Sequence, residues 1–130
     1  MAALSDYAEK LLLDWMMTAG AATRPTAWYV ALYTAAPSDA GGGTEVSGSG
    51  YARQAVTFAA ASTPAGTTSN TNAVTFTAAG GDWGAVSHIG LFDASASGNL
   101  LWHGAMTATK TIADGDTLGF AIGNIDLTLA

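Results

Sequence analysis

The sequence contains no cysteine and few charged residues, and each shortage excludes a class of protein. Without cysteine, the 130-residue chain forms neither disulfides nor thiolate metal sites. Only four lysines and arginines oppose ten aspartates and glutamates, which gives a formal net charge of −6. A sequence-independent nucleic-acid binder needs several basic residues to neutralise phosphates, and attraction to an anionic membrane surface needs them too. We therefore expect neither nucleic acid nor a membrane as a partner.

Long apolar runs are missing as well. No stretch of about 18 uncharged apolar residues occurs, so the sequence predicts no membrane-spanning helix. The opening segment, MAALSDYAEKLLLDWMM, lacks the basic start of a signal peptide, and its apolar positions are interrupted by Asp6, Glu9, Lys10 and Asp14. We therefore expect the chain to be made and folded in a cytoplasm.

The shortage of charge also bears on the surface of the folded chain. Charged residues make up 11% of the sequence and hydrophobic residues 49%. A small soluble monomer normally covers its surface with many more charges. We expect serine, threonine, glycine and alanine to cover part of the surface, and other copies of the chain to bury the rest. A homotrimer is the expected assembly.

One amphipathic helix is predicted within residues 1–20. Its apolar residues recur at three- and four-residue spacing and form a single stripe. Ser5 can cap the amino end, and Gly20 is the expected stop. The stripe, which includes Leu11 and Trp15, is expected to pack on the core, with contact to a partner chain as the alternative. Both residues are therefore interface candidates.

The remaining chain, residues 26–130, has the pattern of an antiparallel β-domain. The tetrapeptide ADGD at 113–116 predicts a tight hairpin. The segment 27–34 is apolar on both faces, which indicates a central strand or one covered on both sides. About seven strands separated by short turns, after one helix, indicate a single mainly β domain with a β-sandwich or jelly-roll-like fold. Aromatic, β-branched and alternating runs predict these strands at residues 27–34, 51–58, 73–78, 85–93, 100–106, 110–112 and 117–129.

A glycine-rich stretch, GGGTEVSGSGYARQAV at residues 41–56, raises the question of a phosphate site. A P-loop needs lysine after its second glycine, but Ser49 follows Gly48. The dinucleotide pattern needs a third glycine where this chain has Arg53. Neither pattern leads into a helix, because YARQAVTF alternates like a strand. The stretch is therefore interpreted as a loop between strands.

Residues 41–50 belong to a flexible loop of about 15 residues, a length that is uncommon in compact domains unless the loop binds something. Arg53 follows this loop and is one of only four cations. We expect it to pair with a carboxylate or with several carbonyl oxygens, within the chain or across an interface. The interface candidates of this region are Gly43, Glu45, Tyr51 and Arg53.

No constellation of residues indicates catalysis or a cofactor. The two histidines, His88 and His103, lack metal-ligand spacing, and GSGYA leads into a strand rather than forming a nucleophile elbow. The aspartates that could bind calcium or act in pairs lie in turn sequences, where aspartate bonds the local backbone: Asp82, Asp93, Asp114 and Asp116. We expect no enzyme activity, no metal and no cofactor.

Four aromatic residues lie near turns or strand ends: Trp28, Tyr51, Trp83 and Trp102. We expect them in the core. The alternative is a surface that stacks on a sugar or on a neighbouring chain.

Two motifs, GTEVSGSGYARQ and GDWGAVSHIGLFDA, occur together in this chain. With their flanking segments and KTIADGDTLGFAIG, they resemble a set of small bacteriophage virion proteins over residues 26–130. Proteins of this kind are labelled tail fibre proteins, or capsid cement and decoration proteins. The resemblance implies a structural protein of the virion, made in the host cytoplasm. Its implied partners are copies of itself and other virion proteins such as the major capsid protein.

The length of the chain favours one of these two roles. A fibre needs reach, which usually comes from a long repetitive chain or a heptad stalk. This sequence has 130 residues and neither feature. We therefore expect a capsid cement protein that stabilises the head shell, with a tail fibre, tail-tip or receptor-binding component as the alternative.

Overall fold

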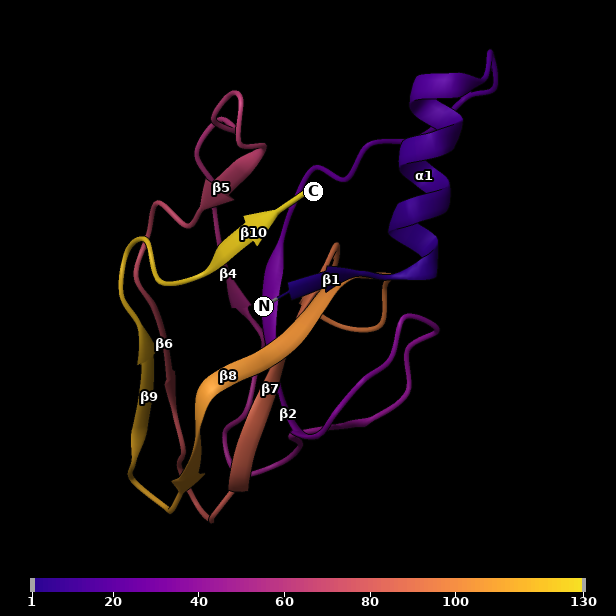
Figure 1. Ribbon diagram of the computed structural model, residues 1–130. Helices are drawn as coiled ribbons and strands as arrows, with labels where there is room; N and C mark the ends of the chain where they lie inside the picture. Colours follow the sequence, from indigo (N-terminus) through magenta and orange to yellow (C-terminus); the bar gives the residue numbers. More distant parts are fainter. Residues whose placement is uncertain (1, 130) are drawn as a thin grey trace.

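The structure is a computed structural model that describes residues 2–129. It is mainly β, with strands that pair antiparallel and one helix near the amino end (Figure 1). The described chain has ten strands rather than the expected seven or so. The elements are β1 (Ala2–Leu4), α1 (Asp6–Met17), β2 (Tyr29–Ala35), β3 (Thr44–Glu45), β4 (Gln54–Ala55), β5 (Thr67–Ser69), β6 (Val74–Thr77), β7 (Gly84–Phe92), β8 (Leu100–Ile112), β9 (Thr117–Phe120) and β10 (Asp126–Thr128).

The large sheet has the strand order β1-β8-β7-β2-β3, and β4 also pairs with β2. Within it, β2 is covered on both faces, as its sequence predicts. Val30 and Leu32 point into the main core, whereas Ala31 and Tyr33 join a second cluster with Phe92 on the opposite face. The first four of these residues are all buried, because neither face of the strand meets solvent.

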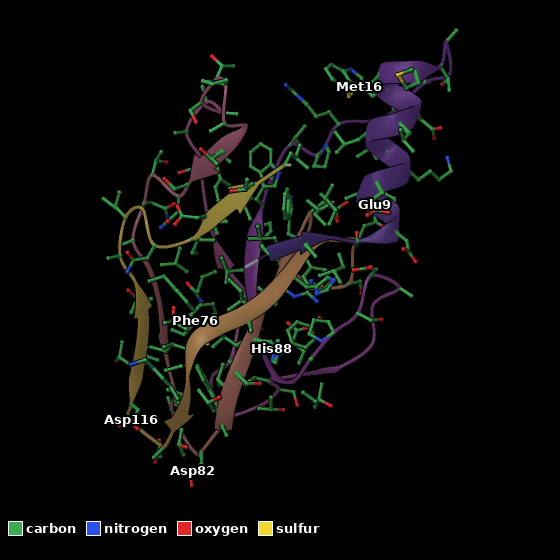
Figure 2. All side chains as sticks on the ribbon, in the orientation of Figure 1. Glu9, Met16, Phe76, Asp82, His88 and Asp116 are labelled. Carbon is green, nitrogen blue, oxygen red and sulfur yellow. The ribbon has the colours of Figure 1, made fainter. Side chains whose placement is uncertain are left out.

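The second layer consists of two small sheets, β6 with β9 and β5 with β10 (Figure 1). Its apolar side chains pack against those of the large sheet in one core, where Figure 2 shows Phe76 between the layers. Trp83 is buried and Trp28, Tyr51 and Trp102 pack against the same core, so the core interpretation of these aromatics is confirmed. The predicted sandwich, with its amino-terminal helix, is therefore present.

The helix is shorter than residues 1–20. It begins after Ser5, whose hydroxyl accepts a hydrogen bond from Ala8 N–H at 3.2 Å, as expected of an N-cap. The preceding residues are extended because β1 pairs with β8. The helix ends at Met17, where the extended backbone of Thr18 stops it before Gly20. No helix within residues 2–129 has the length and apolarity to cross a membrane.

Three strand predictions are wrong in detail. The predicted strand 117–129 is two strands, β9 and β10, which pair with β6 and with β5 in separate small sheets. Of residues 51–58, only β4 forms a ladder, because only this part lies beside β2. The predicted strands 100–106 and 110–112 are parts of one strand, β8. The pairing of β8 with β7 is interrupted between Ala105 and Lys110.

The ADGD segment makes a tight turn, in which Asp116 N–H donates to Ala113 O at 2.9 Å, but it does not close a hairpin. The strands on either side have different partners, since β8 pairs with β7 and β9 pairs with β6. The turn therefore carries the chain from one layer of the sandwich to the other.

Candidate functional site

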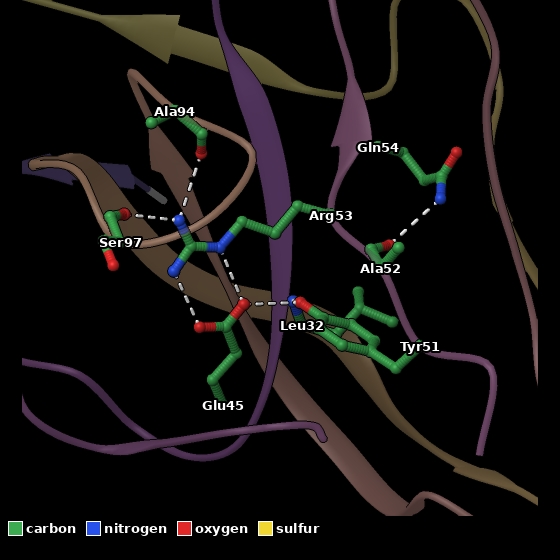
Figure 3. Close-up of polar contacts among 8 residues, drawn as sticks. All are labelled: Leu32, Glu45, Tyr51, Ala52, Arg53, Gln54, Ala94 and Ser97. Carbon is green, nitrogen blue, oxygen red and sulfur yellow. Dashed lines mark hydrogen bonds and ion pairs between the residues drawn. The ribbon is translucent and has the colours of Figure 1, made fainter. Parts of the chain in front are cut away.

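Three of the predicted interface residues meet beside β2 in an ion-pair cluster, formed by Glu45, Tyr51 and Arg53 (Figure 3). Arg53 Nε and Nη2 donate to Glu45 Oε1 and Oε2, each at 2.8 Å, which is the two-pronged geometry that a guanidinium offers a carboxylate. Tyr51 Oη donates to Glu45 Oε1 at 2.7 Å and accepts from Leu32 N–H at 3.1 Å. The cluster is thereby anchored to the backbone of β2.

The remaining contacts of Arg53 extend to the turn after β7. Its Nη1 donates to Ala94 O at 3.1 Å and to Ser97 O at 2.7 Å, as Figure 3 shows. The guanidinium carbon lies 3.6 Å from the centre of the Phe92 ring, a cation–π contact. Only 8% of the Arg53 side chain is exposed. The expected ordered pair is confirmed within the chain, with both a carboxylate and carbonyl oxygens as partners.

Burial and hydrogen bonding act in opposite directions on the charges of this cluster. Burial raises the pKa of the Glu45 carboxyl, but hydrogen bonds from Arg53 and Tyr51 and the Arg53 charge outweigh it, so this pKa lies below its usual value. The bond to Glu45 raises the pKa of Arg53 against the effect of burial. Burial is also the largest influence on the Tyr51 phenol, whose pKa is raised. The site therefore holds a charged pair and a neutral phenol at neutral pH.

The depressed pKa of Glu45 predicts a pH dependence of stability. Because the folded state holds the carboxylate more strongly than the unfolded state, whose carboxyl has a pKa of 4.5, the ion pair stabilises the fold above that pH. The contribution should be lost as the pH falls below 4.5 through the pKa of the folded state. Urea unfolding of the wild type and of Glu45→Gln should differ clearly at pH 7, and the difference should shrink as the pH falls below 4.5. A difference that persists undiminished at the lower pH would contradict this role of the carboxylate.

The loop that contains Gly43 is more ordered than predicted. Thr44 and Glu45 form β3, which pairs with β2, so residues 41–50 are not one flexible loop. Gly43 has a φ of +74°, and a Cβ there would lie 2.7 Å from Ala35 O and Pro37 N. Its backbone packs too closely for a side chain, and this restricts the residue to glycine. Gly43 thus shapes the loop inside its own chain.

The two interface candidates on the helix, Leu11 and Trp15, differ in how far they are buried. Ala8 is buried and Leu11 half-buried where α1 lies on β1 and β8. Trp15, one helical turn beyond, is 69% exposed, and Figure 2 shows the neighbouring Met16 at the end of the helix away from the sheets. The expectation of core packing is therefore wrong for the carboxyl-terminal half of α1, because that half extends past the sheet that covers its start.

Sequence reasoning missed a contact between β8 and the segment that joins β2 to β3, which also bonds the start of α1. His103 Nε2 and Asp39 Oδ1 lie 2.7 Å apart, and the backbone N–H of Asp6 donates to Asp39 O at 2.9 Å. The two side chains are 64 positions apart in the sequence, so no local pattern could predict that they pair. His88 lies elsewhere, with its ring 2.8 Å from the hydroxyl of Ser87.

All four turn aspartates accept from backbone N–H groups, but only Asp93 and Asp116 bond the local backbone as their positions predict. Asp82 and Asp114 instead join two turns whose bonded residues are 32 and 34 positions apart. Asp82 Oδ1 accepts from Asp114 N–H at 2.8 Å, and Asp114 Oδ1 accepts from Gly80 N–H at 2.8 Å. Asp93 likewise accepts from Asn99 N–H at 2.7 Å. Within residues 2–129, no group of three or more histidine, aspartate and glutamate side chains could hold a metal ion. The carboxylates therefore hold turns in place.

The fold and these contacts define a small β-sandwich module whose polar side chains tie its own loops together and whose helix end presents apolar side chains. A family model described as "Podophage GP4 fiber I protein gp80" matches residues 3–128. The match spans nearly the whole chain, which therefore belongs to this family. The protein is thus a structural protein of a bacteriophage virion, as the motif resemblance implied. No curated protein matches the chain.

Proposed function

We propose that the protein is a fibre component of the virion, in its tail, rather than a capsid cement protein. The observation that carries this proposal is the family match over residues 3–128, since the family is described as a fibre protein. The short chain favoured a cement role when only the sequence was considered, but this is a weaker argument than the family match. Short subunits reach far when each copy binds the next through two different surfaces, because such contacts form rings or extended stacks.

The site supports a mechanical rather than a catalytic role. The ion-pair cluster fixes β3, the segment before β4 and the turn after β7 to one another, which stiffens one face of the sandwich. A subunit that transmits force or holds a position needs such internal ties. Its proposed partners are other copies of this chain and neighbouring virion proteins, and contact with them would bury the exposed apolar end of α1.

Cryo-electron microscopy of the intact virion tests the location. We expect density that fits the sandwich at the tail, in a number of copies set by the tail symmetry. Particles that lack the protein should keep the heat stability of their heads, because a fibre does not clamp capsomers. Sandwich density distributed over the head lattice would refute the fibre role, and so would earlier heat-induced genome release from the depleted particles.

A further inference from the structure

A small pocket lies where the start of α1, the segment that joins β2 to β3 and the turn after β7 come together (Figure 1). Its volume is about 500 Å³, within the range of about 300–1,000 Å³ that is usual for pockets of small ligands. None of the three residues of the ion-pair cluster lines it. The side chains that give it its chemistry are Asp6, Tyr7, Tyr33, Asp39 and Asn99.

Tyr33 brings an unused hydroxyl to this pocket. Only 4% of the residue is exposed, because its ring packs in the cluster with Ala31, Phe92 and Leu100. The hydroxyl makes no hydrogen bond within residues 2–129, yet no fully enclosed side-chain oxygen or nitrogen in that range lacks a partner, so it must touch solvent. The pocket is the opening that Tyr33 lines. Burial raises the pKa of this phenol, so at neutral pH it keeps its proton and offers a free O–H donor.

Two carboxylates supply acceptors in the same pocket. The backbone N–H of Asp6 donates to Asp39 O at 2.9 Å, which holds the two residues side by side. Asp39 uses Oδ1 for His103, at 2.7 Å, whereas its Oδ2 and the carboxylate of Asp6 have no hydrogen-bond partner within residues 2–129. No lysine, arginine or histidine lines the pocket. An anionic ligand would therefore meet two like charges without a counter-charge.

An aromatic ring and an open stretch of backbone complete the lining. Tyr7, in the first turn of α1, is 40% exposed, and the negative face of its ring attracts the C–H bonds of a ligand that stacks on it. Gly41 and Gly42 line the pocket from the loop, and a Cβ at either position would have nothing within 4 Å. The pocket therefore has room beside its loop as well as polar groups within it.

We propose that this pocket binds a neutral sugar ring. Sugar hydroxyls both donate and accept, so they match the free carboxylate oxygens of Asp6 and Asp39 as well as the O–H of Tyr33. The apolar C–H face of the same ring can stack on Tyr7.

Other classes of ligand match the pocket less well. An ammonium or guanidinium group would satisfy the carboxylates, but it has no acceptor for the Tyr33 O–H. A metal ion needs more ligands, and residues 2–129 contain no group of three or more histidine, aspartate and glutamate side chains that could hold one. The proposal rests on the chemistry of the pocket and does not depend on where in the virion the chain is placed.

The test titrates the purified chain with methyl α-glucoside, methyl α-galactoside and methyl α-mannoside, followed by saturation-transfer difference NMR. At least one should bind with a dissociation constant on the order of 1 mM, because a single sugar ring has few atoms and each adds little affinity. Glucuronate, which is anionic, should bind at least about tenfold more weakly than the best neutral probe.

Two variants test the assigned groups. Tyr33→Phe removes only the unbonded hydroxyl, so the thermal midpoint should stay within about 2 °C of the wild type while the dissociation constant of the sugar rises about 3–10-fold. Tyr29→Phe, in the same strand but outside the pocket lining, is the matched control. Asp6→Asn should weaken binding by a similar factor, and Glu9→Gln on the same helix, also outside the lining, should not.

Three results would overturn the proposal. The first is that none of the three neutral probes binds at about 20 mM. The second is a Tyr33→Phe variant that binds the sugar as tightly as the wild type. The third is tighter binding of butylammonium than of any sugar, which would identify a site for cations. All of these measurements use the purified chain, so their failure is distinguishable from a failure of the fibre role, which is tested on the virion.

Discussion

Arg53→Met is expected to lower the free energy of unfolding by about 3–5 kcal/mol, which is the usual cost of removing one partner of a buried ion pair. The substitution keeps much of the aliphatic stem but removes every donor. Glu45 would stay mostly buried with only the Tyr51 bond, and the carbonyl oxygens of Ala94 and Ser97 would lose their partner. The turn after β7 would also lose its tie to β3. The thermal midpoint should fall by roughly 10–20 °C.

The same replacement at Arg24 is the matched control. Arg24 lies exposed in the segment before β2, so Arg24→Met should change stability by no more than about 0.5 kcal/mol. Arg53→Lys should fall between the two, because lysine keeps the charge but cannot make two parallel bonds to a carboxylate. Urea unfolding at pH 7 measures all three. If Arg53→Met and Arg24→Met destabilised equally, the cluster would not be a determinant of stability.

Local patterns in the sequence were sufficient where an element carries its own signal. The serine cap and the apolar spacing of α1 are contained within a few residues, and so is the run of apolar residues in β2. The need of Arg53 for partners was also predictable, since it is one of only four cations, starts a strand after a loop and is outnumbered by acidic residues.

The missed features depend on distant parts of the chain. β3 and β4 are two-residue strands that exist because β2 lies beside them, and β1 interrupts a helical pattern because β8 offers it an edge. The ADGD turn has a hairpin sequence, yet the strands around it pair in different layers. A turn sequence specifies a change of direction, whereas strand pairing is decided by the whole core.

The ion-pair cluster and the helix show the same difference between what local patterns predict and what depends on distant parts of the chain. Glu45, Tyr51 and Arg53 could each be proposed from the sequence, but their junction requires β3 and the segment before β4 to lie on the same side of β2. The apolar stripe of α1 was read correctly as a stripe. Its exposed end follows from the extent of the sheet beneath it, which the helix sequence does not encode.

Asn70 is the residue whose importance the sequence hides most completely. It lies between β5 and β6 and is 1% exposed. Its Nδ2 donates to Asn72 O at 2.7 Å and to Ala121 O at 3.0 Å, while its Oδ1 accepts from Ile125 N–H at 2.9 Å. Its backbone N–H also donates to Ile125 O at 3.2 Å. One amide side chain therefore joins the first half of the second layer to the segment between β9 and β10.

Asn70→Leu is expected to cost about 3–5 kcal/mol, because two carbonyl oxygens and one N–H would lose their partners at a buried site. Asn124→Leu is the matched control: its side chain is exposed, and little change is expected. Urea unfolding at pH 7 measures both. Equal stability of the two variants would show that water replaces the amide, and the proposed tie between the two parts of the layer would be wrong.

Asn70→Asp tests the direction of the same bonds. The aspartate keeps an oxygen for Ile125 N–H but turns its other oxygen toward the carbonyl groups of Asn72 and Ala121, which already carry partial negative charge. Burial and these carbonyls would raise the pKa of the new carboxyl above its unfolded value. The protonated form, which can donate to one carbonyl, is then favoured at low pH, so the deficit relative to wild type should be smaller at pH 4 than at pH 7. A deficit that is the same at both pH values would mean that the side chain at this position does not face the two carbonyls.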